Sequence, residues 1–226
     1  MLHKLVPTKT IENFFTEEEI SVIESYPKKY PERNQKYMAS EPWMDPSFVE
    51  RQIFAFNDDP TYSLAHKILR NKINQHFGTD VIIGGWHILT AYFPYRAHGD
   101  AVYGEYGIND FNYGAWTLII PLDDYPSATI LYNEHSFHTK IIPQWLQGQP
   151  IKNAIDEETR LKYLTLESKE TVERLSIEQI FHWKRNTCFA ASRYKFHGSD
   201  DFYGHGVPFK RGIIVWTALP NDSKSA

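Results

Sequence analysis

The chain of 226 residues is 42% hydrophobic, which is enough apolar material for the core of one folded domain. Its formal net charge is −4 and its basic residues are spread along the sequence, so the composition argues against a nucleic-acid-binding surface. A single cysteine, Cys188, excludes an internal disulfide, and no apolar segment reaches membrane-spanning length, so we expect a cytoplasmic protein that does not use a membrane.

The amino-terminal third of the chain is predicted to contain two helices, with a strand at residues 51–57 between them. Thr16 and Glu19 form a capping-box pattern in front of an apolar stripe, which indicates the start of a helix. A second helix is expected from the pair Asp59 and Pro60, because a cap followed by proline at the first helical position is a typical helix start. We expect residues 1–80 to form a helical support for the rest of one domain that spans residues 1–226.

From residue 81 onward the pattern changes to short β-branched and aromatic runs separated by Gly, Pro, Asn and Asp. This pattern predicts a mostly β fold, a sandwich or barrel with flanking helices, over residues 81–219. The expected strands cover residues 81–83, 86–95, 115–122, 127–133, 187–193 and 211–219. Residues 143–184 are predicted to be a helical insertion between strands, because "DEETRLKYL" and "KETVERLSIEQIFHW" have helical patterns.

A candidate metal site begins in the segment "WHILTAYFPYRAHGD", an apolar strand that turns and presents His98 and Asp100. Residues two apart on a strand share a face, so the imidazole and the carboxylate can point to one place. They would be two of the three ligands of a 2-His-1-carboxylate iron(II) site. For the third ligand we favour His197, which ends an apolar strand and is followed by Gly198.

Other histidines remain as alternatives for the third ligand. His205 is the main competitor, but its glycine-rich setting is more typical of a loop. His135 and His138 are three residues apart, which places them on opposite faces of a strand.

Arg211 opens the last predicted strand, where residues 211, 213, 215 and 217 share one face. Ile213 and Val215 lie on that face, so we expect it to face the interior of the β structure. A guanidinium in an apolar interior is costly unless an anion meets it, and a carboxylate is a natural bidentate partner. The alternative is a surface arginine at the start of a strand.

Together, His98-Gly99-Asp100, His197 and Arg211 resemble the motif of the iron(II)- and 2-oxoglutarate-dependent dioxygenase superfamily. The resemblance implies a double-stranded β-helix, or jelly roll, over roughly residues 81–219. It implies that His98, Asp100 and His197 bind iron(II) and that Arg211 pairs with the distal carboxylate of 2-oxoglutarate. Many members also place a tyrosine before the first histidine, so Tyr92 is expected to contact the co-substrate, with Tyr95 as the alternative.

The resemblance implies an enzyme that releases succinate and carbon dioxide and hydroxylates a C–H bond. Halogenating relatives lack the ligand carboxylate, so Asp100 favours hydroxylation. The alternatives are a non-redox, cupin-like jelly roll and a cupin-type dioxygenase that needs no 2-oxo acid and no Arg211.

The partner is expected to be a small metabolite, an amino acid or a peptide residue, and the sequence leaves the substrate and the oligomeric state open. The loop at residues 101–114 is a candidate substrate lid, with Tyr103, Glu105, Tyr106 and Asn109 at the mouth or packed on the wall. Arg193 is expected either to meet an anionic substrate group or to pair with Asp200 or Asp201 at the surface.

Overall fold

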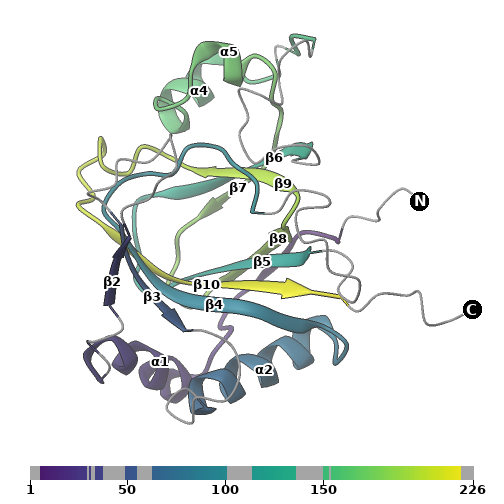
Figure 1. The fold of residues 1–226 in the computed structure, drawn as a ribbon. Coiled ribbons are helices and arrows are strands. Elements are labelled where there is room, and N and C mark those ends of the chain that lie inside the picture. Colours follow the sequence, from purple (N-terminus) through teal and green to yellow (C-terminus); the bar gives the residue numbers. More distant parts are fainter. Residues whose placement is uncertain are drawn as a thin grey trace, which may run out of the picture.

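The computed structural model of the chain describes residues 6–29, 31, 34–37, 49–54, 63–100, 114–135, 150–152 and 154–219. Two antiparallel sheets face each other, and helices cover their outer surfaces (Figure 1). The larger sheet has seven strands in the order β1-β8-β5-β10-β4-β3-β2, and the smaller has the order β7-β6-β9. This arrangement confirms the predicted jelly roll with flanking helices.

The strands differ in detail from those expected. Their bounds are β1 Lys9–Ile11, β2 Asn34–Tyr37, β3 Val49–Phe54, β4 Ile82–Ala91, β5 Gly114–Pro121, β6 Ala128–His135, β7 Ile177–His182, β8 Cys188–Ser192, β9 Lys195–Ser199 and β10 Lys210–Ala218. The two strands expected at 81–83 and 86–95 are one strand, β4. His197 lies in β9, a separate strand that pairs with β6 rather than with the large sheet.

The amino-terminal helices α1 (Glu17–Lys29) and α2 (Ser63–Phe77) pack against the outer face of the large sheet (Figure 1). The capping box is present: the Thr16 hydroxyl accepts a hydrogen bond from the Glu19 N–H, and the Glu19 carboxylate accepts one from the Thr16 N–H. The expected start of the second helix at Asp59 and Pro60 lies outside the described residues.

Central strands of the large sheet divide their side chains between two apolar environments. In β10, Ile213 and Val215 pack in the cluster that contains the α1 and α2 side chains, whereas Ile214 faces the space between the sheets. In β5, Leu118 packs with the helices and Ile119 faces the smaller sheet. Both faces of these strands are therefore apolar, so the sequence pattern alone does not show which face lies inside.

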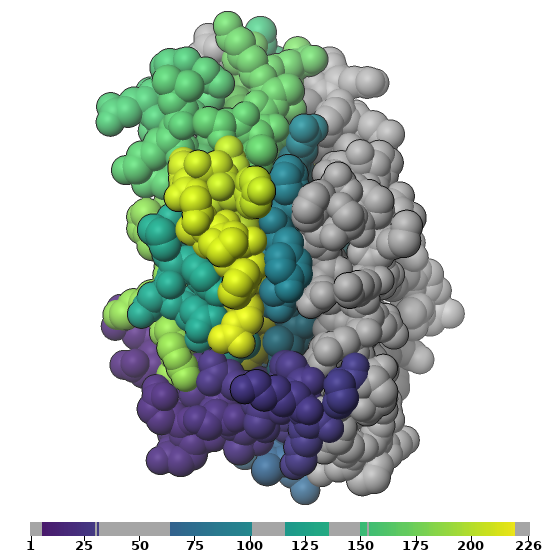
Figure 2. All heavy atoms as spheres, turned by 90° about the vertical axis from the view of Figure 1, so that its left-hand side faces the viewer, coloured from purple at the N-terminus to yellow at the C-terminus, as the bar shows by residue number. Residues whose placement is uncertain are grey.

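The helical insertion is shorter than predicted. It holds α4 (Glu157–Tyr163) and α5 (Lys169–Val172), which pack on the outer face of the small sheet, at the end of the molecule opposite α1 (Figure 2). The prediction of helix up to residue 184 is wrong, because residues 177–182 form strand β7 and pair with β6. In this strand Phe181 packs in the cluster between the sheets and its neighbour Ile180 packs against the outer cluster, an alternation that the helical interpretation overlooked. Residues 136–149 and 153 lie outside the described part of the chain.

Among the described helices, none has the length and apolar character needed to cross a membrane.

Candidate metal centre

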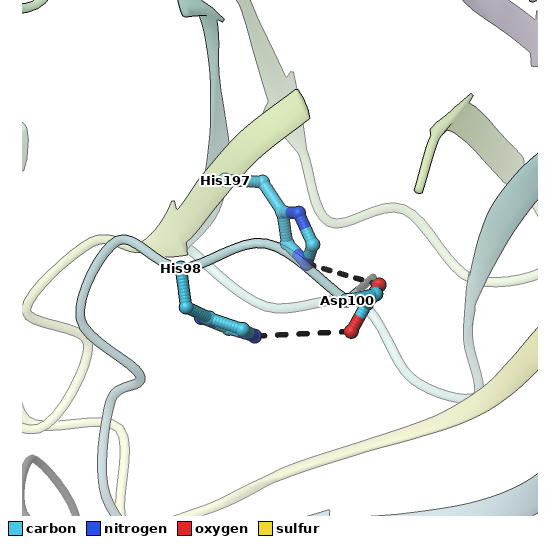
Figure 3. Close-up of side chains that lie close together, drawn as sticks. All are labelled: His98, Asp100 and His197. Atoms are coloured by element: carbon cyan, nitrogen blue, oxygen red, sulfur yellow. Dashed lines mark ion pairs between the residues drawn. The ribbon is translucent and has the colours of Figure 1, made fainter. Parts of the chain in front are cut away.

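His98, Asp100 and His197 converge between the two sheets, and one ligand atom from each lies within 4.8 Å of the others. Both imidazole rings point toward the Asp100 carboxylate (Figure 3). The His197 Nε2 lies 3.5 Å from Asp100 Oδ2, and the His98 Nε2 lies 4.0 Å from Asp100 Oδ1. The described residues contain no second group of this kind. Three nitrogen and oxygen donors on one side of a small space are the ligand set expected for a 2-His-1-carboxylate metal site.

Backbone pairing brings the two histidines together although they are 99 positions apart in the sequence. The His98 N–H donates to the His197 carbonyl at 2.8 Å, and the His197 N–H donates to the His98 carbonyl at 2.9 Å. Next to this bridge, a methyl group on Gly198 would lie 3.0 Å from the Ala97 nitrogen. The close approach of the two chains therefore requires glycine directly after His197.

The ring nitrogens of both histidines have defined roles. The His98 Nδ1 lies 2.7 Å from the Arg96 carbonyl oxygen. Because a carbonyl only accepts hydrogen bonds, Nδ1 carries the proton and Nε2 is left with a lone pair for a metal. The His197 Nδ1 makes a longer contact of 3.3 Å to the Lys195 carbonyl, which favours the same tautomer.

Asp100 is an anion held in place from two sides. Its backbone N–H donates to the Arg193 carbonyl at 3.1 Å, and its Oδ2 accepts a short hydrogen bond from the Thr117 hydroxyl. Burial raises the pKa of the Asp100 carboxyl, but His197, His98, the Thr117 hydroxyl and Arg193 outweigh burial and lower it to about 2. The site therefore offers two imidazole nitrogens and one carboxylate that is ionised at neutral pH.

The pocket that contains this centre is also lined by Lys210. The Lys210 side chain is 1% exposed. Its ammonium donates to the Ser127 hydroxyl at 2.9 Å and lies 3.9 Å from Asp200 Oδ1. It also lies 4.1 Å from the centroid of the Trp183 ring. The pocket is lined by His87, Leu89, Ala91, Tyr95, His98, Asp100, Thr117, Ile119, Thr129, Trp183, His197, Gly198, Ser199, Lys210, Ile214 and Trp216.

The structure does not bring Arg211 to this pocket. Its guanidinium makes two hydrogen bonds to the Asp123 carboxylate, at 2.8 and 3.0 Å, and the side chain is 39% exposed. The expected orientation of β10 is wrong because Ile213 and Val215 face the helices rather than the interior. A change of one residue in register exchanges the two faces of a strand, so the cation in the pocket is Lys210.

Sequence analysis missed Lys210 although it directly precedes Arg211. Lys210, Ile214 and Trp216 share the inner face of β10, but both faces of this strand carry apolar residues, so the pattern did not indicate which face lies inside. Trp183 was also missed, because the segment that contains it was assigned to the helical insertion.

The two tyrosine candidates lie in different places. Tyr95 lines the pocket, and the centroid of its ring lies 5.8 Å from that of His98. Tyr92 is not among the pocket-lining residues, and its ring packs near Phe209, with the centroids 6.0 Å apart. The geometry therefore favours Tyr95, the alternative, over Tyr92.

The other candidates from the sequence have mixed outcomes. His205 is exposed and does not join the group of ligands. Arg193 is buried, with 9% of its surface exposed, so the expectation of a surface ion pair is wrong. His138 and the proposed lid residues Tyr103, Glu105, Tyr106 and Asn109 lie outside the described residues.

Comparison with solved structures identifies the fold. One match is the non-heme alpha ketoglutarate dependent carbocyclase SnoK from nogalamycin biosynthesis, at 13% identity and a TM-score of 0.55, covering 94% of this chain and 79% of that one. This chain shares the fold of 2-oxoglutarate and iron(II) oxygenases. A 2OG-Fe(II) oxygenase family oxidoreductase from Burkholderia pseudomallei matches at 11% identity and a TM-score of 0.52, covering 93% and 84%.

A third match adds a ligand-bound relative. The epimerase SnoN, in a structure with Fe3+, alpha ketoglutarate and nogalamycin RO, matches at 10% identity and a TM-score of 0.53, covering 94% of this chain and 78% of that one. No protein-family model and no curated sequence matches the chain. The similarity therefore establishes the fold, and the chemistry has to be argued from the site itself.

A methyl group at position 198 tests the close packing beside the centre. In Gly198→Ala the new Cβ would meet the Ala97 nitrogen at 3.0 Å and its Cα at 3.1 Å. Both are backbone atoms, so the segment that carries His98 must move. We expect a loss of about 1–3 kcal/mol in the free energy of unfolding, measured by denaturant titration. An unchanged unfolding midpoint would show that this approach is less tight than described.

Proposed function

We propose that the protein is an iron(II)- and 2-oxoglutarate-dependent oxygenase that hydroxylates a small metabolite, an amino acid or a peptide residue. The observation that carries the proposal is the convergence of His98, Asp100 and His197 in a pocket that is also lined by the buried side chain of Lys210. The shared fold with oxygenases of this kind supports it.

The ligand set fits iron(II) in chemistry as well as in spacing. Two imidazole nitrogens and one carboxylate with a pKa of about 2 are the nitrogen and oxygen donors of a 2-His-1-carboxylate iron(II) site. Thr117 keeps one carboxylate oxygen oriented, and the Arg96 and Lys195 carbonyls orient the two imidazoles. Iron(II) bound here would supply the oxidation chemistry, in which 2-oxoglutarate and dioxygen are consumed and succinate and carbon dioxide are released.

Lys210 is the proposed anchor for the distal carboxylate of 2-oxoglutarate, in place of Arg211. A buried ammonium that already lies over the Trp183 and Phe202 rings loses little further freedom when it binds an anion. Asp200 lies near it, but the Asp200 carboxylate is bound by the Ser127 hydroxyl and the Ala128 N–H. Those contacts hold Asp200 in place and leave the ammonium available to a second carboxylate. Tyr95, at the wall of the pocket, is the proposed tyrosine contact in place of Tyr92.

The substrate is proposed to enter on the side of Trp216, six positions along β10 from Lys210. The walls there are largely apolar, with Leu89, Ile119 and Ile214 among them. The Trp216 Nε1 is buried and has no hydrogen-bond partner among the described residues. A buried donor of this kind favours a substrate with an acceptor oxygen near the carbon that is oxidised.

Anaerobic titration of the purified protein with iron(II) and then 2-oxoglutarate tests the proposal. We expect a visible charge-transfer band that grows with 2-oxoglutarate, because the 2-oxo acid chelates the metal. On exposure to air the same mixture should release succinate slowly, and a true substrate found by screening should stimulate that release.

The outcomes separate this proposal from its alternatives. A band without succinate release in air, across all candidate substrates, would favour a binding protein. Metal binding with neither a band nor succinate would favour a jelly roll that does not use 2-oxoglutarate. Mass analysis of the product identifies the reaction: hydroxylation adds one oxygen atom, whereas epimerisation leaves the mass unchanged and ring closure removes two hydrogen atoms.

A further inference from the structure

Glu167 reaches from the insertion to the backbone next to His98. Its Oε1 accepts a hydrogen bond from the Ala97 N–H at 2.6 Å. Glu167 lies in the turn between α4 and α5, where its own N–H donates to the Leu164 carbonyl at 3.1 Å. Leu164 and Ala97 belong to the same buried apolar cluster. The insertion is therefore packed against the segment that carries His98, and the Glu167 carboxylate is held at its backbone.

One peptide group joins Glu167 to His98. The N–H of the peptide between Arg96 and Ala97 donates to Glu167, and the carbonyl of the same peptide accepts from the His98 Nδ1 at 2.7 Å. A carboxylate bound at the N–H polarises a peptide and makes its carbonyl a stronger acceptor, because hydrogen bonds in a chain reinforce one another. The Glu167 carboxylate, this peptide group and the His98 imidazole thus form one series of hydrogen bonds.

We propose that Glu167 is a positioning residue that acts on His98 through the peptide between Arg96 and Ala97. It strengthens the hydrogen bond at Nδ1, which fixes the tautomer and the ring orientation that present Nε2 to a metal. Ligating histidines commonly donate to a carboxylate or to a backbone carbonyl, and here the two are connected in series. The inference rests on the proposed function in one respect, since it requires His98 to bind the metal.

His197 provides an internal comparison. Its Nδ1 contact with the Lys195 carbonyl is longer, at 3.3 Å, and this carbonyl belongs to a different peptide, the one between Lys195 and Phe196. A change at Glu167 should therefore affect the His98 imidazole and leave the His197 imidazole as it was. A general loosening of the fold would change both.

Two substitutions at Glu167 and one control distinguish the effect of Glu167 on His98 through the peptide, here called the relay, from an effect on the stability of the insertion. Glu167→Ala removes the acceptor, and Glu167→Gln keeps an acceptor oxygen but removes the charge. Asp156→Ala is the matched control, because Asp156 caps α4 of the same insertion through the Thr159 N–H. Zn(II) serves as a redox-inert probe of the site, and its affinity is measured by competition with a coloured chelator.

We expect Glu167→Ala to lower Zn(II) affinity about 10-fold, the lower end of the range for groups that support a metal ligand. Glu167→Gln should lower it less, and Asp156→Ala should leave it unchanged. In protein labelled with 15N-histidine, the His98 Nδ1 and Nε2 resonances should shift in Glu167→Ala. They should shift by a smaller amount in the same direction in Glu167→Gln, while the His197 resonances stay in place.

Unchanged Zn(II) affinity together with an unchanged His98 spectrum in both Glu167 variants would overturn the relay. If Glu167→Ala does not fold, the spectrum of Glu167→Gln decides, and no shift at His98 overturns it. His98→Ala distinguishes this failure from a failure of the proposed function. If His98→Ala loses Zn(II) while both Glu167 variants keep the wild-type affinity and His98 spectrum, the relay alone is wrong. If His98→Ala keeps Zn(II), the proposed metal site itself is wrong.

Discussion

Lys210→Met is expected to abolish the binding of 2-oxoglutarate while leaving the binding of iron(II) intact. The substitution keeps an unbranched stem of similar length beside Trp183 but removes the ammonium that would meet the distal carboxylate. Removal of one partner of a buried, hydrogen-bonded charge pair costs about 2–5 kcal/mol, which corresponds to at least about 30-fold in affinity. The measurement is the anaerobic charge-transfer titration with 2-oxoglutarate, compared with a direct iron(II) titration.

Arg211→Met is the matched control, one residue away on the same strand. Arg211 pairs with Asp123 in a position where 39% of its side chain is exposed, and ion pairs of that kind contribute about 1 kcal/mol or less. We expect its affinity for 2-oxoglutarate to equal that of the wild type. The reverse result, with loss in Arg211→Met and none in Lys210→Met, would restore the assignment made from the sequence.

The anchor should also give 2-oxoglutarate binding a pH dependence. Burial lowers the pKa of the Lys210 ammonium to about 7, although Asp200 opposes this shift. Only the protonated form attracts a carboxylate, so below that pH the affinity should be constant. Above it the free enzyme must take up a proton to bind, and the affinity should fall by up to about tenfold for each pH unit. Lys210→Arg, which stays protonated, should remove the slope.

Asp100→Ala should lower the affinity for iron(II) by more than about 100-fold, because a direct anionic ligand is lost. Loss of a residue that only supports a ligand lowers metal affinity by at most about 100-fold. Asp100 is ionised at neutral pH, since its pKa is about 2, so its removal takes a full negative charge from the centre. Iron(II) affinity is measured anaerobically by chelator competition, and succinate release should disappear with it.

Two histidine variants accompany the Asp100 prediction. His197→Ala should lose iron(II) comparably, and His205→Ala should bind it as the wild type does, because His205 is exposed and outside the group of ligands. Retention of iron(II) in Asp100→Ala would mean that the metal binds elsewhere in the protein.

Local sequence patterns predicted local features well. The Thr16 and Glu19 capping box predicted the start of α1, because both of its hydrogen bonds connect residues three apart. The spacing of His98 and Asp100 predicted their convergence for the same reason. Of the two later histidines, His197 rather than His205 lies with His98 and Asp100, and the two differ in local pattern, since one ends an apolar strand and the other lies in a glycine-rich loop.

The errors arose where two structures share one pattern. Ile177 to His182 contains apolar residues at spacings that suit a helix or a strand, and pairing with β6 decided in favour of the strand. Arg193 was expected to pair with Asp200 or Asp201 at the surface or to meet a substrate group, and the structure buries it. Its burial depends on the chain folding over it, which no local pattern describes.

By itself, then, the sequence determined the class of fold, the start of α1 and the three side chains that meet, since each depends on near neighbours or on a strand end. Only the tertiary structure decided which cation enters the pocket. The α1 and α2 helices cover the outer face of the large sheet, so Ile213 and Val215 face them and Lys210 turns inward. When both faces of a strand are apolar, its sequence does not indicate which face lies inside, and the layers that pack against the strand determine this.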